Sequence, residues 1–212
     1  MSIQLCEVGK TINGNKVLSD ISYEFNKGKI YGLVGKNGSG KTMLLRAIAG
    51  LIKPTSGKIV IDGKELWKDI DFPPELGILI EKPQFIDFFT GYENLKKIAE
   101  VRQKVRVETI CDYMVKFSLD PTSKQIMKKY SLGMKQKIGI IQAVMESPEI
   151  LILDEPFNAL DRDSVKLLKE ILLDTKEKNG IIIVTSHHED DIQYICDEFL
   201  MIENGRLIND KL

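Results

Sequence analysis

The sequence has few of the residues from which several kinds of site are built. Its three cysteines, Cys6, Cys111 and Cys196, are far apart and odd in number, so neither a disulfide framework nor a zinc site is expected. Thirty Lys and Arg residues against 31 Asp and Glu give a formal net charge of −1. A protein that binds along nucleic acid usually has a basic excess. We therefore expect a protein of a reducing compartment that does not bind nucleic acid.

Long apolar runs are also missing. No stretch approaches the roughly 18 apolar residues that a membrane-spanning helix needs. The first residues, MSIQLCEVGK, lack the basic start and apolar run of a signal peptide. With 212 residues, 43% of them hydrophobic, the chain can bury one substantial core and carry a smaller appended lobe. We therefore expect a chain that is soluble on its own and forms a single domain.

The apolar residues that are present change their periodicity along the chain. Short apolar runs predict strands in the N-terminal third, at residues 3–8, 17–25, 29–35, 57–63 and 76–81. Helical periodicity follows from 91 to 117, with expected buried positions at Leu95, Ile98, Ala99, Val107, Ile110, Met114 and Phe117. Helices and strands then alternate, at 132–146, 149–154, 163–178, 181–186 and 189–196, before a hairpin that turns at Asn204-Gly205. This order predicts an α/β fold with parallel strands, crossover helices and a helical lobe.

The clearest motif is a phosphate-binding loop, GKNGSGKT, between a predicted strand and a predicted helix. Its glycines allow backbone N–H groups to turn toward phosphate oxygens. The lysine of such a loop reaches the β- and γ-phosphates, and the final hydroxyl binds Mg²⁺. The alternative, a glycine-rich turn before a helix, is weak in this context. The predicted ATP-binding residues are Gly35, Lys36, Asn37, Gly38, Ser39, Gly40, Lys41 and Thr42.

Two acidic residues follow the apolar strand ILIL, at the edge where open α/β sheets bind ligands. Asp154 can join the Mg²⁺ shell, and Glu155 can act as general base toward the attacking water. Taken alone, such a pair could be a solvated strand end, but the phosphate loop favours the functional interpretation. His187 follows the next strand and could bond a γ-phosphate oxygen, although a surface role for it and for His188 stays open.

The segment YSLGMKQK begins a further predicted helix that could bind an anion. Ser131 is its natural N-cap, and Gly133 removes a side chain where an anion would approach the backbone. A plain capped helix with a solvated face explains the same residues. The stretch alone does not decide between the two.

In order and spacing these motifs resemble the ATP-binding cassette (ABC) ATPase family, from about Ile3 to Ile208. The resemblance implies a P-loop NTPase core, with a mixed sheet and an N-terminal antiparallel β region, and an inserted helical lobe. The expected boundaries are one domain, 1–212, with a core lobe at about 1–84 and 149–212 and a helical lobe at about 85–148. The resemblance also implies ATP and Mg²⁺ as cofactors. It implies Glu155 as the catalytic glutamate, His187 as the switch histidine and a catalytic role for Lys41.

Further site residues are implied only by the resemblance. A signature that completes the nucleotide site of an opposite subunit falls on Ser131, Leu132, Gly133 and Met134. The D-loop at the same junction falls on Asn158, Ala159, Leu160 and Asp161. Nucleotide contacts fall on Thr11 and Ile12, and metal contacts on Thr42, Asp154 and Glu81. Ile12 departs from the family's usual aromatic, and Glu81 from its usual glutamine, for which Gln84 is the alternative.

The partners are also implied by the resemblance. Aromatic residues gather at the entrance to the helical lobe, at Phe85, Phe88, Phe89 and Tyr92, where the family binds a membrane subunit, although several rings could instead pack in the core. The motifs look most like ATPase subunits of bacitracin- or lantibiotic-type exporters, which implies a second ATP-binding subunit, an integral-membrane permease and a place on the inner face of the cell membrane. The alternative is a soluble ABC ATPase in translation, repair or iron–sulfur assembly. A regulatory module without hydrolysis conflicts with the joint presence of Lys41, Asp154, Glu155 and His187.

Overall fold

The computed structural model describes residues 1–81, 83–186 and 192–208, and its N-terminal part forms an antiparallel sheet. The sheet has the strand order β2-β1-β4-β5. Its strands are β1 Ser2–Ile12, β2 Asn15–Asn26, β4 Ser56–Ile61 and β5 Lys64–Glu65. β1 and β2 form a long hairpin whose turn, Asn13-Gly14, has positive φ at both residues. That geometry matches the right-handed twist of paired strands.

A second, mixed sheet has the order β10-β9-β3-β8-β7-β6. Its strands are β3 Lys29–Val34, β6 Leu76–Leu79, β7 Ile150–Leu153, β8 Ile181–Thr185, β9 Glu198–Glu203 and β10 Arg206–Ile208. All neighbours are parallel except β10, which pairs antiparallel with β9 at the edge. β7 and β8 are apolar and buried at nearly every position, as expected for parallel strands covered on both faces.

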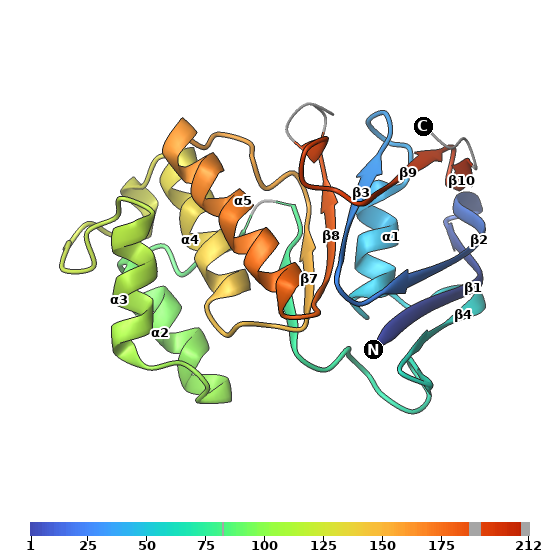
Figure 1. Ribbon diagram of the computed structural model, residues 1–212, viewed down its shortest axis with the longest axis horizontal. Helices are drawn as coiled ribbons and strands as arrows, with labels where there is room; N and C mark the ends of the chain where they lie inside the picture. The colour runs from blue at the N-terminus through green and yellow to red at the C-terminus, as the bar shows by residue number, and fades with distance from the viewer. Residues whose placement is uncertain (82, 187–191, 209–212) are drawn as a thin grey trace.

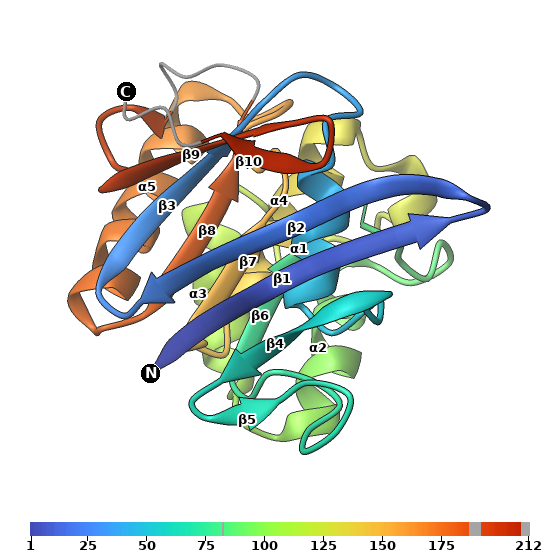
Figure 2. The same ribbon diagram turned by 90° about the vertical axis from the view of Figure 1, so that its right-hand side faces the viewer.

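Helices cover both faces of the mixed sheet. They are α1 Lys41–Ile48, α2 Gly91–Arg102, α3 Val107–Lys116, α4 Leu132–Val144 and α5 Arg162–Glu177, with a 3₁₀ turn at Met127–Lys129. α1 lies between the two sheets, α4 and α5 cover the opposite face, and α2 and α3 lie beyond α4 (Figures 1 and 2). Among the described residues no helix is both long and apolar enough to cross a membrane.

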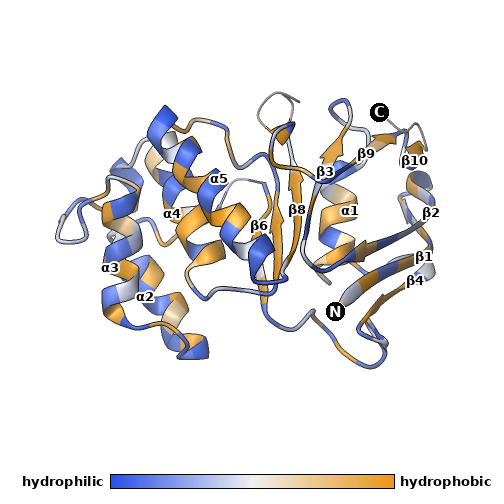
Figure 3. Cartoon of the chain, viewed as in Figure 1, coloured by the Kyte–Doolittle hydropathy of each residue, from blue (hydrophilic) through white to orange (hydrophobic). Residues whose placement is uncertain are grey.

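The two faces of the mixed sheet bury separate apolar cores. Ile150 and Ile152 of β7 pack with α1 and the antiparallel sheet, whereas Leu151 and Leu153 pack with the helices of the other side. This is the alternation of side chains along a strand. In Figure 3 apolar residues accordingly colour both the strands and the inward stripes of the helices. The carboxyl ends of β3, β7 and β8 are thus held rigidly from both sides.

The structure confirms the α/β class and the mixed sheet, and it corrects several local predictions. Residues 91–117, predicted to have helical periodicity, form two helices, because α2 ends at Arg102 and the next residue, Gln103, has a left-handed φ of 54°. Val107, predicted to be buried, is 46% exposed at the start of α3. β1 extends to Ile12 through its pairing with β2. Residues 189–191 of the predicted helix 189–196 lie outside the described part of the chain.

Candidate functional site

The loop Gly35–Gly40 connects β3 to α1 and presents the start of that helix. Gly40 is the N-cap residue, with a φ of 113°, and a Cβ there would lie 3.1 Å from the Val17 carbonyl. Glycine fits this conformation without strain. No side chain caps α1, and its first turn contains no acidic residue. The N–H groups at its start are therefore oriented for an anion.

Lys41 lies over its own loop. Its buried ammonium donates hydrogen bonds to the carbonyls of Gly35, at 2.6 Å, and Lys36, at 3.3 Å. A lysine ammonium beside a helix start that no side chain caps favours the multiply charged phosphates of a nucleotide.

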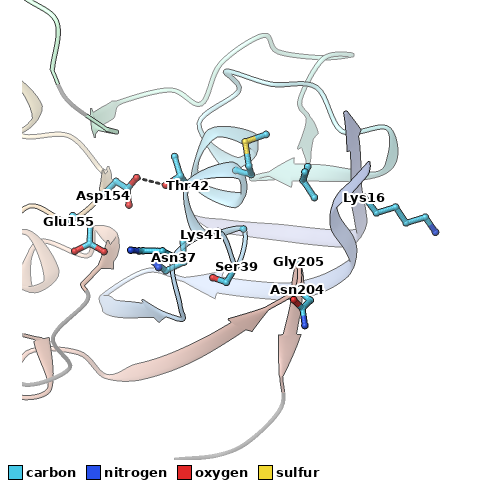
Figure 4. Close-up of a pocket in the computed structure, with 13 residues that line it drawn as sticks. Lys16, Asn37, Ser39, Lys41, Thr42, Asp154, Glu155, Asn204 and Gly205 are labelled. Carbon is cyan, nitrogen blue, oxygen red and sulfur yellow. Dashed lines mark hydrogen bonds between the residues drawn. The ribbon is translucent and has the colours of Figure 1, made fainter. Parts of the chain in front are cut away.

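Asp154 follows β7 and lies between two hydroxyl groups, that of Thr42 in the first turn of α1 and that of Thr185 at the end of β8. Thr42 donates to its Oδ2 at 2.7 Å, and Thr185 donates to its Oδ1 at 2.7 Å. Figure 4 shows the bond between Thr42 and Asp154. A hydroxyl and a carboxylate are hard oxygen ligands, and Mg²⁺ commonly takes one or two from the protein and the rest from phosphates and water. The residues present therefore fit Mg²⁺.

Glu155 follows with a strained backbone. Its φ is 50°, and its N–H donates to the Thr185 hydroxyl at 2.8 Å. A non-glycine residue in this region costs on the order of 1 kcal/mol, and such residues concentrate at functional sites. The turn directs the Glu155 side chain into the same pocket as Asn37 (Figure 4). Thr185 thus fixes both acidic residues, a role that the sequence did not reveal.

These groups line one pocket of about 410 Å³. Its described lining residues are Lys16, Val17, Asn37, Gly38, Ser39, Gly40, Lys41, Thr42, Met43, Asp154, Glu155, Asn204 and Gly205. The structure therefore brings the phosphate loop and both acidic residues together. Not every lining residue was predicted from the sequence, and those that were missed include Lys16, Val17, Asn204 and Gly205. The Asn204-Gly205 pair indicated only a hairpin turn.

Other predicted contacts lie outside this pocket. Thr11 and Ile12 end β1 and are not among the lining residues, and the Thr11 N–H donates to the Thr55 hydroxyl at 2.9 Å. The Glu81 carboxylate pairs with Arg46 of α1 at 2.7 Å, and Glu81 lines a separate pocket of about 310 Å³ with Gln84. His187 lies outside the described residues. Its role stays a prediction.

The predicted signature and D-loop meet each other at a different place. Ser131 caps α4 by accepting from the Met134 N–H at 3.2 Å. A Cβ added to Gly133 would lie 2.6 Å from the Ala159 carbonyl, so the two segments touch. Lys137 pairs with Asp161 at 2.6 Å. Neither Ser131–Met134 nor Asn158–Asp161 lines the phosphate-loop pocket of this chain.

The same helix is tied to the segment that follows β7. The Gln136 side-chain amide donates to the carbonyls of Pro156, at 3.1 Å, and Glu155, at 3.3 Å. Lys137, together with the backbone N–H and hydroxyl of Ser164, holds the pKa of Asp161 well below its usual range. α4 is therefore bonded to the segment that follows β7 at several points.

Comparison with known families and proteins agrees with this arrangement. Residues 18–158 match the family model described as ABC transporter. The chain is 45% identical to the uncharacterized ABC transporter ATP-binding protein YybJ of Bacillus subtilis, over 97% of this chain and 94% of that protein. It is 32% identical to the lantibiotic transport ATP-binding protein SrtF of Streptococcus pyogenes (99% and 90% covered) and 34% to the bacitracin transport ATP-binding protein BcrA of Bacillus licheniformis (98% and 69%).

Solved structures share the fold. The structure of an ATP-binding subunit of an ABC transporter superposes with a TM-score of 0.89 at 26% identity, over 98% of this chain and 88% of that chain. A dimeric bacterial ABC transporter cassette superposes with a TM-score of 0.85 at 20% identity, over 99% and 98%. At that identity the second likeness shows the fold alone.

Proposed function

The chain belongs to the ABC transporter family of ATP-binding domains, and from this premise we propose that it powers a separate membrane permease as one of two ATP-binding subunits. The cargo that we propose is a peptide antibiotic or another amphipathic compound, which the permease exports. Relatives named for bacitracin and lantibiotic transport support this choice. The subunit itself would stay at the inner face of the membrane through the permease.

One observation carries the two-subunit proposal: the signature lies outside the phosphate-loop pocket of its own chain. Ser131 and Gly133 begin a capped helix that is suited to an anion, yet the ATP site is built from other segments. A second copy or a homologue can place its signature against this pocket, and the signature of this chain can then lie against the pocket of the partner. ATP then joins the subunits, and hydrolysis weakens the contact.

Within the pocket the side chains take separate roles. Lys41 and the loop N–H groups bind the β- and γ-phosphates, and Thr42 and Asp154 hold Mg²⁺, which supplies charge neutralisation when bound. Glu155 accepts a proton from water as the water oxygen attacks the γ-phosphorus. The bond from that phosphorus to the bridging oxygen breaks, and ADP and phosphate leave. Glu81 could join the metal only after it separates from Arg46.

The site for the permease that we propose is the region around Phe88. Its ring is 72% exposed, and Ile86 nearby is 40% exposed. The separate pocket of about 310 Å³ is lined in part by Pro83 and Gln84, which come shortly before Ile86 and Phe88 in the chain. Exposed apolar side chains of this kind suit a short helix of a partner protein.

The variant Glu155→Gln tests the ATPase proposal. It keeps the ligands for phosphate and Mg²⁺ but removes the base, so turnover should fall by at least about 100-fold. ATP should then accumulate in a dimer, visible as a shift in size-exclusion chromatography with light scattering. The double variant with Lys41→Ala is the control and should remain monomeric. A monomer with bound ATP and Mg²⁺, in the presence of the permease, would contradict the proposal.

Purification of tagged Glu155→Gln protein with ATP, from detergent-solubilised membranes of its host, tests the partner. Mass spectrometry should find a multi-span membrane protein in stoichiometric amount, and untagged Glu155→Gln protein carried through the same steps is the control for non-specific recovery. Recovery of soluble partners alone, from an extract shown to contain intact membrane complexes, would instead favour a soluble ABC machine.

A further inference from the structure

The Asn204-Gly205 turn between β9 and β10 is bonded to two walls of the nucleotide pocket. The Gly205 N–H donates to the Ser39 carbonyl in the phosphate loop, at 2.8 Å, and the Ser19 N–H of β2 donates to the Gly205 carbonyl, at 2.8 Å. Gly205 has a φ of 75°, and a Cβ there would lie 2.5 Å from the Val17 carbonyl. The turn is therefore fixed in place by its backbone alone.

The Asn204 side chain is not needed for these bonds. It is exposed at the pocket wall, and no hydrogen bond of its amide is found within the described residues. Its φ of 48° is tolerated by asparagine and also by glycine. The amide offers two N–H donors and one carbonyl acceptor. It is thus a positioned polar group whose hydrogen-bonding capacity is open.

The place of Asn204 in the pocket indicates what it could bind. Asp154 and Glu155 lie at one end, and Lys16 lies at the other (Figure 4). Asn204 lies beside Ser39, on the side of the phosphate loop away from the acidic residues (Figure 4). Phosphates that occupy the Lys41 and Thr42 end leave the nucleoside on the side of Val17 and Asn204.

The chemistry of the lining favours a polar contact with the nucleoside. Among the described lining residues there is no aromatic ring on which a base could stack. A neutral amide can bond ribose hydroxyls or the edge of a base, and it has no charge with which to attract phosphate. We propose that Asn204 is a nucleoside-binding residue of this ATPase, an inference that rests on the proposed ATP site.

Two ligands separate this role from a structural one. Isothermal titration calorimetry measures binding of ATP and of inorganic triphosphate, which has no nucleoside, to wild type and to Asn204→Gly. The variant keeps the turn conformation, so the Kd for ATP should rise about 5- to 20-fold while the Kd for triphosphate stays within about twofold. Asn179→Gly, at another asparagine of positive φ (64°) outside the pocket, should change neither value. Lys41→Ala should weaken both ligands.

Asn204→Ser is the second variant and guards against a folding defect, because serine is another common turn residue and adds no charge that would repel phosphate. It removes the N–H donors of the amide. The Kd for ATP should again rise while the Kd for triphosphate changes little, and the melting midpoint should be unchanged. A further titration with 2′-deoxyATP and GTP locates the contact on the sugar or the base. Unchanged ATP affinity in both variants would overturn the proposal, and so would an equal loss for ATP and triphosphate. Failure of wild type to bind ATP would overturn the proposed ATP site as well, so the two failures are distinguishable.

Discussion

At the residue scale, Thr185 is the group on which the acidic end of the site depends. It ends β8, beside β7, and its fully buried hydroxyl donates to Asp154 and accepts from the Glu155 N–H. One hydroxyl therefore orients the carboxylate that we assign to Mg²⁺ and the backbone that carries the proposed base. A buried hydroxyl that forms two such bonds is costly to remove.

Thr185→Val keeps the shape of the side chain and removes both hydrogen bonds. We expect kcat for ATP hydrolysis to fall about tenfold or more, because the acidic groups lose their fixed position, while KM for ATP changes little. Unfolding by urea should show a loss of about 1 to 3 kcal/mol. Steady-state kinetics at saturating Mg²⁺ provides the rate.

Thr175→Val is the matched control, since the Thr175 hydroxyl donates to the Ile171 carbonyl in α5, outside the pocket. It should lose stability without the selective loss of kcat. Equal kinetic effects of the two variants would show that Thr185 has no positioning role.

Site residues could be predicted from the sequence where a motif requires particular residue types at a particular spacing. Lys41, Thr42 and Asp154 were found in this way, and the structure places them in one pocket. Thr185 and Asn204 could not be predicted, because their roles come from neighbours far apart in the chain. The ion pair of Glu81 with Arg46 could not be predicted either, because it depends on how β6 approaches α1.

At the scale of elements, α4 connects the predicted signature to the segment that follows β7. Ser131 caps the helix, Gly133 touches Ala159, and Gln136 bonds the backbone after β7. Lys137, whose side chain is only 10% exposed, pairs with Asp161, the N-cap of α5. The two helix starts are thus coupled through one ion pair.

Asp161→Asn tests this coupling through its pH dependence. Asparagine still caps α5, but it leaves the Lys137 ammonium without its anion. The pKa of Asp161 is lower in the folded state than in the unfolded state. Its ionised carboxylate therefore contributes to folding stability above the unfolded pKa, and this contribution is lost as pH falls through the folded pKa. The free energy of unfolding of wild type should therefore exceed that of the variant by about 1 kcal/mol near pH 7, a figure that allows for solvent screening of a carboxylate that is 57% exposed, and the difference should shrink steadily as pH falls below about 4.

Urea unfolding at several pH values measures the difference. Asp174→Asn, which breaks the exposed pair of Asp174 with Lys178 at the C-terminal end of α5, is the control and should cost no more than a few tenths of a kcal/mol. A difference for Asp161 that stays constant down to pH 2 would exclude the ion pair as its source.

Elements themselves were predictable where periodicity is strong. The strands β7 and β8, the helices α4 and α5 and the Ser131 cap follow the sequence pattern closely. The break after Arg102 was not predicted, because the residues of 91–117 keep helical spacing across it. Val107 is exposed because it begins a new helix, α3, so its position relative to the buried residues of α2 does not determine which way it faces.

At the scale of the whole molecule, two separate surfaces serve what we propose to be one reaction. The phosphate loop and the acidic residues line one pocket, and Leu132 of the signature, 61% exposed, lies on another surface. In a symmetric dimer each surface of one subunit meets the other surface of its partner. A change in the signature should therefore spare ATP binding to the monomer.

Ser131→Arg places a bulky cation at the helix start. We expect ATPase activity to fall at least about tenfold and ATP-dependent dimers to be lost, because the exposed helix start can no longer approach a phosphate in the partner. Calorimetry on the monomer should give an ATP affinity within about twofold of wild type. Parallel loss of affinity and melting midpoint would indicate misfolding.

Mixing two inactive variants then decides whether the sites are shared. In a mixed dimer of Lys41→Ala and Ser131→Arg, both changes fall in the same site, and the other site has a native loop and a native signature. With independent sites, an equal mixture should recover about a quarter of wild-type ATPase activity if pairing is random, and up to about half if only mixed dimers form. Each variant alone, at the same total concentration, is the control. A mixture no more active than its components would contradict independent shared sites, because a site complete within one chain gains nothing from its partner.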